Sequence, residues 1–125
     1  VGVGMVRGFG LQRGAIASSV GHDAHNITVV GTDDDDIRAA IDAIIALDGG
    51  IVAVVNGETV AALPLPLAGL LSDRPIVEVA ARHHTLEKAA RDLGCTAAAP
   101  FALLSFMALS VIPAVRVTDQ GLIEL

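Results

Sequence analysis

The segment Ile51-Val52-Ala53-Val54-Val55-Asn56-Gly57-Glu58-Thr59-Val60-Ala61-Ala62-Leu63 carries the strongest local signal for the fold. Two runs that suit strands, Ile51–Val55 and Glu58–Leu63, flank the dipeptide Asn56-Gly57. Asn-Gly between two such runs is the strongest short-range indication of a β-hairpin. The hairpin must end near Pro64, because a proline has no N–H to donate within a central strand. We therefore predict an antiparallel hairpin in the middle of the chain.

Three shorter strands are predicted on the N-terminal side of this hairpin. Residues 2–7 alternate glycine with larger residues, and the runs Ala15–Val20 and Ile27–Val30 are apolar. Short apolar runs bounded by glycine and polar residues are typical of strands. A loop containing two histidines would then join the second of these strands to the third.

A helix is predicted between the third strand and the hairpin. The run Thr32-Asp33-Asp34-Asp35-Asp36 suits a helix start, since Thr32 or Asp33 can cap it and carboxylates complement the positive end of the helix dipole. Isoleucines at helical spacing give one apolar face up to about Leu47, and Gly49-Gly50 ends the helix. The same acidic run could be read as a metal site, but helix capping explains it more simply.

A second helix is predicted to start at Ser72-Asp73-Arg74-Pro75 and to stop at Gly94. Its apolar stripe is expected to contain Ile76, Val79, Ala80, His83, Leu86, Ala90 and Leu93. His83 and His84 are adjacent and point about 100° apart along a helix, so they cannot face one ion together. We interpret both histidines as structural or surface groups, and Cys95 as a small buried residue.

The remaining segments complete an α+β fold in a single domain, residues 1–125. Residues 65–71 form a packed loop or a short helix, and Pro100–Leu109 a buried short helix or a strip over the sheet. Ala114–Thr118 and Leu122–Leu125 are predicted to pair across a turn. The expected architecture is a mostly antiparallel sheet of about six to seven short strands with two main helices packed on it.

Composition narrows the classes of function. The net charge is −6, the basic residues are scattered, and the chain has no Tyr or Trp, which together argue against nucleic-acid binding. No apolar run is long enough to span a membrane, and a single cysteine suits a reducing cytoplasm. Because 53% of the residues are hydrophobic, we expect part of the surface to be covered by another domain or by a second copy of the chain.

The candidate site residues are His22, Asp23, His25 and Asn26, four polar groups within five residues. Imidazole and carboxylate suit a metal such as zinc, manganese or iron, but only a turn could bring His22 and His25 to the same face of an extended segment. An ordinary solvated turn is the simpler alternative, because glycine, aspartate and asparagine favour turns. No serine elbow, phosphate loop or dinucleotide fingerprint is present, so the chain holds no complete active site that its motifs identify.

Several motifs together resemble the C-terminal domain of bacterial adenine deaminases over essentially the whole chain. They are the run from Gly2 to Val20, His22-Asp23-Ala24-His25-Asn26-Ile27, Val30-Gly31-Thr32, the run from Ala62 to Leu70, Leu104-Ser105-Phe106 and Val111-Ile112-Pro113. Gly21 and Ala24 depart from the pattern, where Ala and Ser are expected, and leave the polar groups in place.

This resemblance implies a parent enzyme of the amidohydrolase superfamily that converts adenine and water to hypoxanthine and ammonia. Its divalent metal, expected to be manganese, iron or zinc, would lie in a catalytic barrel domain that this chain lacks, so the fragment itself would bind no cofactor. His22, Asp23, His25 and Asn26 would then contribute to the mouth of that barrel. The alternatives are a non-catalytic packing or oligomerisation domain, and an independent small-molecule binding domain.

Overall fold

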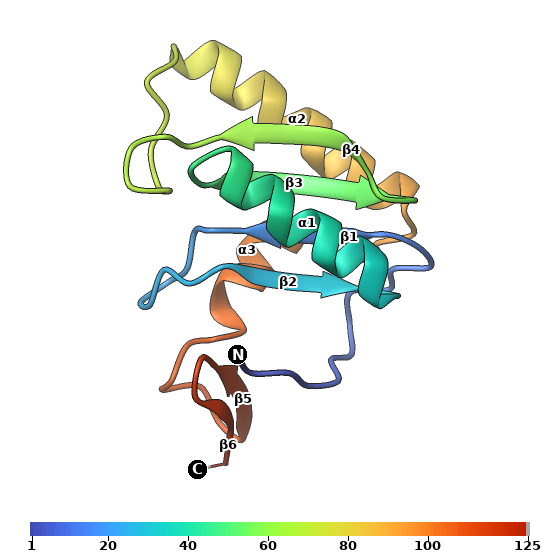
Figure 1. Cartoon of the computed structure of the whole chain (residues 1–125), viewed down its shortest axis with the longest axis vertical. Coiled ribbons are helices and arrows are strands. Elements are labelled where there is room, and N and C mark those ends of the chain that lie inside the picture. Colours follow the sequence, from blue (N-terminus) through green and yellow to red (C-terminus); the bar gives the residue numbers. More distant parts are fainter. Residues whose placement is uncertain (125) are drawn as a thin grey trace.

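The computed structural model describes residues 1–124, and within them three helices and six strands form an α+β fold (Figure 1). The predicted fold class is therefore confirmed. In chain order the elements are β1 (Ala15–Ser18), β2 (Thr28–Gly31), α1 (Asp34–Ala46), β3 (Gly50–Val55), β4 (Glu58–Pro64), α2 (Ile76–Asp92), α3 (Pro100–Phe106), β5 (Val115–Thr118) and β6 (Gly121–Glu124).

The main sheet has four antiparallel strands in the order β2-β1-β3-β4. The predicted central hairpin is confirmed, with Val55 opposite Glu58 in the register of β3 and β4. Asn56 and Gly57 both have positive φ angles, 53° and 76°, as a type I′ hairpin turn requires. The strands predicted at Ala15–Val20 and Ile27–Val30 form β1 and β2, the other half of this sheet.

Helices cover both faces of the main sheet, with α1 in front of it and α2 and α3 behind it in Figure 1. Successive residues of a strand point to opposite faces. Ala15 and Ala17 of β1 accordingly pack toward Ala40 and Ile44 of α1, whereas Ile16 belongs to the core on the other face. The central strands β1 and β3 are buried on both sides, which explains why they read as apolar runs rather than as alternating patterns.

The start of α1 forms as its acidic run predicts. Asp33 is the N-cap, and its Oδ1 accepts the backbone N–H of Asp36 at 2.8 Å. Asp34, Asp35 and Asp36 occupy the first turn, next to the positive end of the helix dipole. Helix capping therefore explains Asp33, as the sequence indicates.

The predicted strand at residues 2–7 is wrong, because the structure assigns no strand to this segment. Glycine weakens a strand through its entropy and its missing side chain. Here Gly2 and Gly4 instead allow the backbone to approach β5 and β6, and a Cβ on Gly2 would collide with the carbonyl oxygen of Thr118. Residues 1–124 therefore contain six strands, the lower end of the predicted six to seven, and these strands divide into two sheets instead of one.

The last predicted strand pair forms a separate two-stranded sheet of β5 and β6, in which Arg116 lies opposite Ile123. The prediction extended this pair to Leu125, which lies outside the described residues. Of the segments left open, residues 65–71 form a loop closed by a bridge between Leu67 and Leu71. Pro100–Phe106 is the third helix.

The start of α2 differs from its prediction. The helix begins at Ile76 with Pro75 at the N-cap and no side-chain cap, while the Oγ of Ser72 accepts the N–H of Arg74 at 3.1 Å in a local turn. The apolar stripe is buried only toward its C-terminal end, at Leu86, Ala90 and the C-cap Leu93, and Ile76 remains 78% exposed. The spacing of apolar residues identifies which face of α2 packs on the sheet, but not how far along the helix that face is covered.

Candidate functional site

The residues His22–Asn26, which we call the polar loop, lie in the connection between β1 and β2. These two strands are antiparallel neighbours, so the rigid sheet holds both ends of the connection. All five residues of the polar loop are exposed. The prediction that this loop joins neighbouring strands is confirmed.

Contacts with α3 and within the turn hold the polar loop. The backbone N–H of His22 donates to the carbonyl oxygen of Ser105 at 3.0 Å. The imidazole ring of His22 stacks on Phe106, with the ring centroids 4.5 Å apart and an interplanar angle of 28°. The loop is therefore attached to the last turn of a helix that is packed on the main sheet.

His25 closes the turn from the other side. Its Nδ1 accepts the backbone N–H of Gly21 at 3.3 Å. In the neutral ring this acceptor role leaves the proton on Nε2, because one ring nitrogen donates when the other accepts. His25 thus presents an N–H donor, Asp23 a carboxylate and Asn26 an amide with both donor and acceptor atoms.

The polar loop does not form a metal centre. No group of three or more His, Cys, Asp or Glu side chains among residues 1–124 could hold a metal ion. The acidic run at the start of α1 is included in that result. What the loop can supply chemically is a set of hydrogen bonds and one carboxylate charge.

Ser19, just before the polar loop, has a structural role that the sequence did not indicate. Its buried Oγ accepts the backbone N–H of Gly50 at 2.8 Å and lies 2.6 Å from the carbonyl oxygen of Gly69, to which it donates. This single hydroxyl joins the end of β1 to the start of β3 and to the loop at residues 65–71. No local pattern predicts this contact, since its partners are 31 and 50 residues away.

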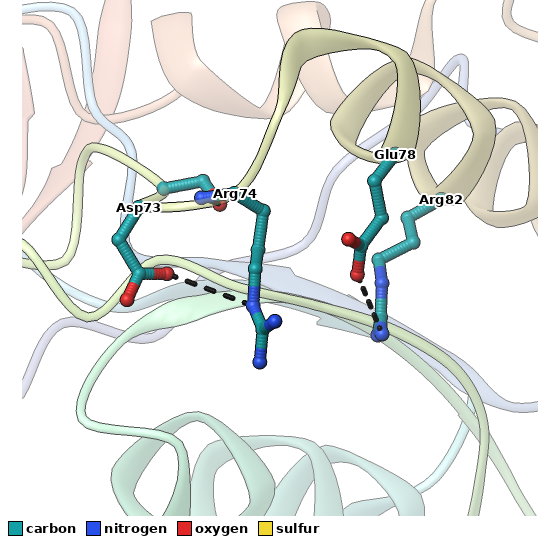
Figure 2. A network of polar contacts seen from close by, with 5 residues as sticks. Asp73, Arg74, Glu78 and Arg82 are labelled. Carbon is teal, nitrogen blue, oxygen red and sulfur yellow. Dashed lines mark hydrogen bonds and ion pairs between the residues drawn. The ribbon is translucent and has the colours of Figure 1, made fainter.

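Two hollows on the surface are alternative sites, and the polar loop lines neither of them. One, of about 210 Å³, lies beside the start of α2, where Arg74 and Arg82 line it. Figure 2 shows that each arginine faces a carboxylate: Arg82 Nη2 is 3.2 Å from Glu78, and Arg74 Nε is 3.9 Å from Asp73. Because both cations are already paired and exposed, this hollow offers little to an anionic ligand.

The second hollow, of about 280 Å³, is lined by Arg13, Lys88 and Asp92 together with apolar residues of β3, β4 and α2. Lys88 pairs with Asp92 at 2.9 Å, and Arg13 Nη2 donates to the backbone carbonyl of Asp92 at 3.5 Å. Its polar groups therefore bond mainly to one another. The polar loop remains the strongest candidate site.

The histidines and the cysteine outside the loop have surroundings that suit packing. His83 lies edge-on to Phe101 with ring centroids 6.2 Å apart, and His84 is exposed. Cys95 is buried in the core between the sheet and α2. None of the three lies among the groups of the polar loop.

Comparison with known proteins finds similarity to adenine deaminases over the whole chain. The family model described as adenine deaminase C-terminal domain matches residues 1–125. The chain is 53% identical over 124 residues to an adenine deaminase of Methylobacterium nodulans, 52% to one of Dehalococcoides mccartyi and 46% to one of Moorella thermoacetica. Each match covers 99% of this chain but only 21–22% of the relative. Within residues 1–124, no helix has the length and apolar character needed to cross a membrane.

Proposed function

The chain belongs to the adenine deaminase C-terminal domain family, and from that premise we propose that it is the C-terminal domain of a longer, metal-dependent adenine deaminase. The full-length protein would convert adenine and water to hypoxanthine and ammonia. The observation that carries this proposal is identity of about one half to adenine deaminases over 99% of the chain. Since the chain spans 22% of those relatives, the catalytic barrel domain would lie in the part outside it.

We propose that the metal of the full-length enzyme is held outside this domain. The described residues contain no suitable cluster of His, Cys, Asp or Glu, so they do not fit a divalent ion. A metal ion, whether manganese, iron or zinc, is therefore assigned to the catalytic barrel domain. We place the whole protein in the cytoplasm, which the single buried cysteine supports.

We further propose that the polar loop lies at the mouth of the barrel and contributes hydrogen bonds there. Active sites of such barrels lie at the face where loops gather. A purine presents amino and ring N–H donors and ring nitrogen acceptors. Asp23 can accept, His25 Nε2–H can donate, and Asn26 can do both. The attachment of His22 to Ser105 and Phe106 supports this role, because a positioned loop loses less entropy when it binds a ligand.

The test uses the full-length protein carrying His22→Ala, Asp23→Asn or Asn26→Ala. We expect kcat/KM for adenine to fall by about tenfold or more in at least one variant, the loss for one hydrogen bond of about 1.4 kcal/mol. The metal content should stay unchanged, because no ligand is removed. His84→Ala on α2 is the matched control, since His84 is exposed and lies outside the loop.

A second candidate is a packing domain without catalytic groups. Large apolar side chains are exposed on several elements, including Ile76 and Val77, both 78% exposed, and Leu71. Such surface is typical of a domain that is covered by a partner. If all three loop variants matched the unmutated enzyme in turnover and in metal content, the polar loop would be structural and this second candidate would stand.

A further inference from the structure

The two ends of the chain form a small unit, residues 1–7 and 109–124, which we call the terminal lobe. It consists of the β5–β6 hairpin and the N-terminal segment beside it, and Figure 1 shows it apart from the layered body. Neither of the two core clusters includes a residue of the lobe. The lobe therefore has to gain its stability from contacts other than those that hold the main sheet.

Arg116 lies inside this lobe with an incomplete set of partners. Its side chain is buried, at 3% relative exposure, and its Nη1 donates to the carbonyl oxygen of Leu109 at 3.3 Å. Its Nε and Nη2 are shielded from solvent and meet no acceptor among the described residues. A buried cation with unmatched donors is strongly unfavourable, so a native environment is expected to supply an acceptor.

The two unmatched nitrogens define which acceptor would fit. Nε and Nη2 form one edge of the planar guanidinium, and their N–H groups are parallel. A carboxylate matches this edge with two hydrogen bonds at once. The acceptor of Nη1, Leu109, lies in the linker between α3 and β5, a segment without a helix or strand. Because Nε and Nη2 are shielded from solvent, a carboxylate from outside can reach them only if part of the lobe moves aside.

The lobe exposes several large apolar side chains beside the charged groups Arg7, Asp119 and Glu124. Val3, Val111, Val115 and Leu122 are each more than half exposed. Exposed apolar side chains beside a buried arginine, with other charges around them, match an interface, whose core is enriched in apolar groups and arginine and whose rim is polar.

We propose that the terminal lobe docks on the catalytic domain of the full-length protein and that a carboxylate of that domain pairs with Nε and Nη2 of Arg116. This inference depends on the proposed function for the existence of that domain. The relatives extend over more than four times the length of this chain, which provides the partner within the same polypeptide. Docking would bury the apolar side chains of the lobe and at the same time give Nε and Nη2 of Arg116 the acceptor that they lack.

The first test measures thiol modification in the full-length protein with Cys95→Ala and other reactive cysteines removed. Val115→Cys probes the lobe, and Ile45→Cys on α1 is the matched control, because the two side chains are 52% and 60% exposed in this domain. We expect the lobe thiol to react at least tenfold more slowly than the control thiol. Similar rates for the two thiols would overturn the docking proposal.

The second test substitutes Arg116 in the Val115→Cys protein and measures the reaction rate of the thiol again. If a carboxylate pairs with Arg116, Arg116→Met leaves that carboxylate buried without a partner, and the thiol should react at least tenfold faster. Arg116→Lys keeps the charge but loses the two-point contact, so its rate should lie between. If Arg116 instead holds a free anion or no acceptor, Arg116→Met should leave the reaction rate of the thiol unchanged or lower it, because a methionine packs in an apolar interface without an unpaired charge. That result would contradict the carboxylate pairing.

These readouts do not use adenine turnover. A full-length protein that fails to deaminate adenine but protects the lobe thiol would contradict the proposed function and leave the docking intact. An active adenine deaminase with an unprotected lobe would contradict only the docking.

Discussion

The carboxylate of Asp36, in the first turn of α1, accepts the backbone N–H of Gly57 at 2.7 Å in the turn of the central hairpin. Its second oxygen accepts the N–H of Asn56 at 3.2 Å. Both N–H groups belong to the turn between β3 and β4, whose two residues have positive φ angles. A single buried carboxylate thus connects the helix that covers the front of the sheet to the hairpin of β3 and β4.

Removing this carboxylate should destabilise the domain. We expect Asp36→Ala to lower the free energy of unfolding by about 1.5–3 kcal/mol, the contribution of a hydrogen bond to a charged group, because two part-buried backbone donors lose their acceptor and can turn to water instead. Urea unfolding of the 125-residue chain measures this change. Asp35→Ala is the control, since it alters the same helix turn at an exposed position and should cost about 0.3–1 kcal/mol through the helix dipole. Equal losses in the two variants would contradict a special role for Asp36.

Ser19 makes a second long-range connection that can be tested in the same way. Ser19→Ala leaves the N–H of Gly50 and the carbonyl of Gly69 without their partner, and should cost about 1–3 kcal/mol, the penalty for a buried polar group left unsatisfied. Ser105→Ala is the matched control, because its Oγ bonds only within α3, to the carbonyl of Ala102. The interpretation fails if unfolding shows the Ser19 variant to be as stable as the control.

The two halves of α2 should respond differently to truncation. Leu86→Ala removes a fully buried side chain and should cost about 2–5 kcal/mol, the range for such cavities. Ile76→Ala, on the exposed first turn of the same helix, should change the stability by no more than about 0.5 kcal/mol. Thermal or urea unfolding of the domain distinguishes the two. A large loss at Ile76 would show that the apolar stripe is buried along its whole length.

The stack between His22 and Phe106 should control the order of the polar loop. Phe106→Leu removes the aromatic contact, and we expect the His22 amide to exchange with solvent about 2–10-fold faster, which corresponds to the ~0.5–1.5 kcal/mol of such a pair. Amide exchange followed by NMR reports this directly, because that N–H donates to Ser105. Leu103→Ala, another half-exposed position of α3, should leave the rate unchanged. An unaltered rate in the Phe106 variant would mean that the backbone bond alone holds the loop.

The proposed roles of the polar loop and the terminal lobe are separable in the full-length protein. Loop variants should change the turnover of adenine, whereas lobe variants should change thiol protection. The two sets of variants share no residue, so a negative result for one proposal leaves the other untouched.

Local chemistry in the sequence was enough to predict much of this fold. Asn56-Gly57 specified the turn of the central hairpin, because few residue pairs tolerate two positive φ angles. Asp33 specified the start of α1, because a side-chain oxygen at that position satisfies a backbone N–H that the helix leaves free. These signals act within a few residues of chain and therefore survive in the sequence alone.

Only the tertiary structure decided where distant segments meet. Residues 2–7 have a strand-like composition but found no partner strand, and Ile76 has helical spacing but lies exposed. No local pattern in the sequence singles out the long-range roles of Asp36, Ser19 and Arg116, and each acquires its role from a burial or a contact that the folded chain creates. Burial and pairing depend on the whole arrangement of layers, which no local pattern of residues contains.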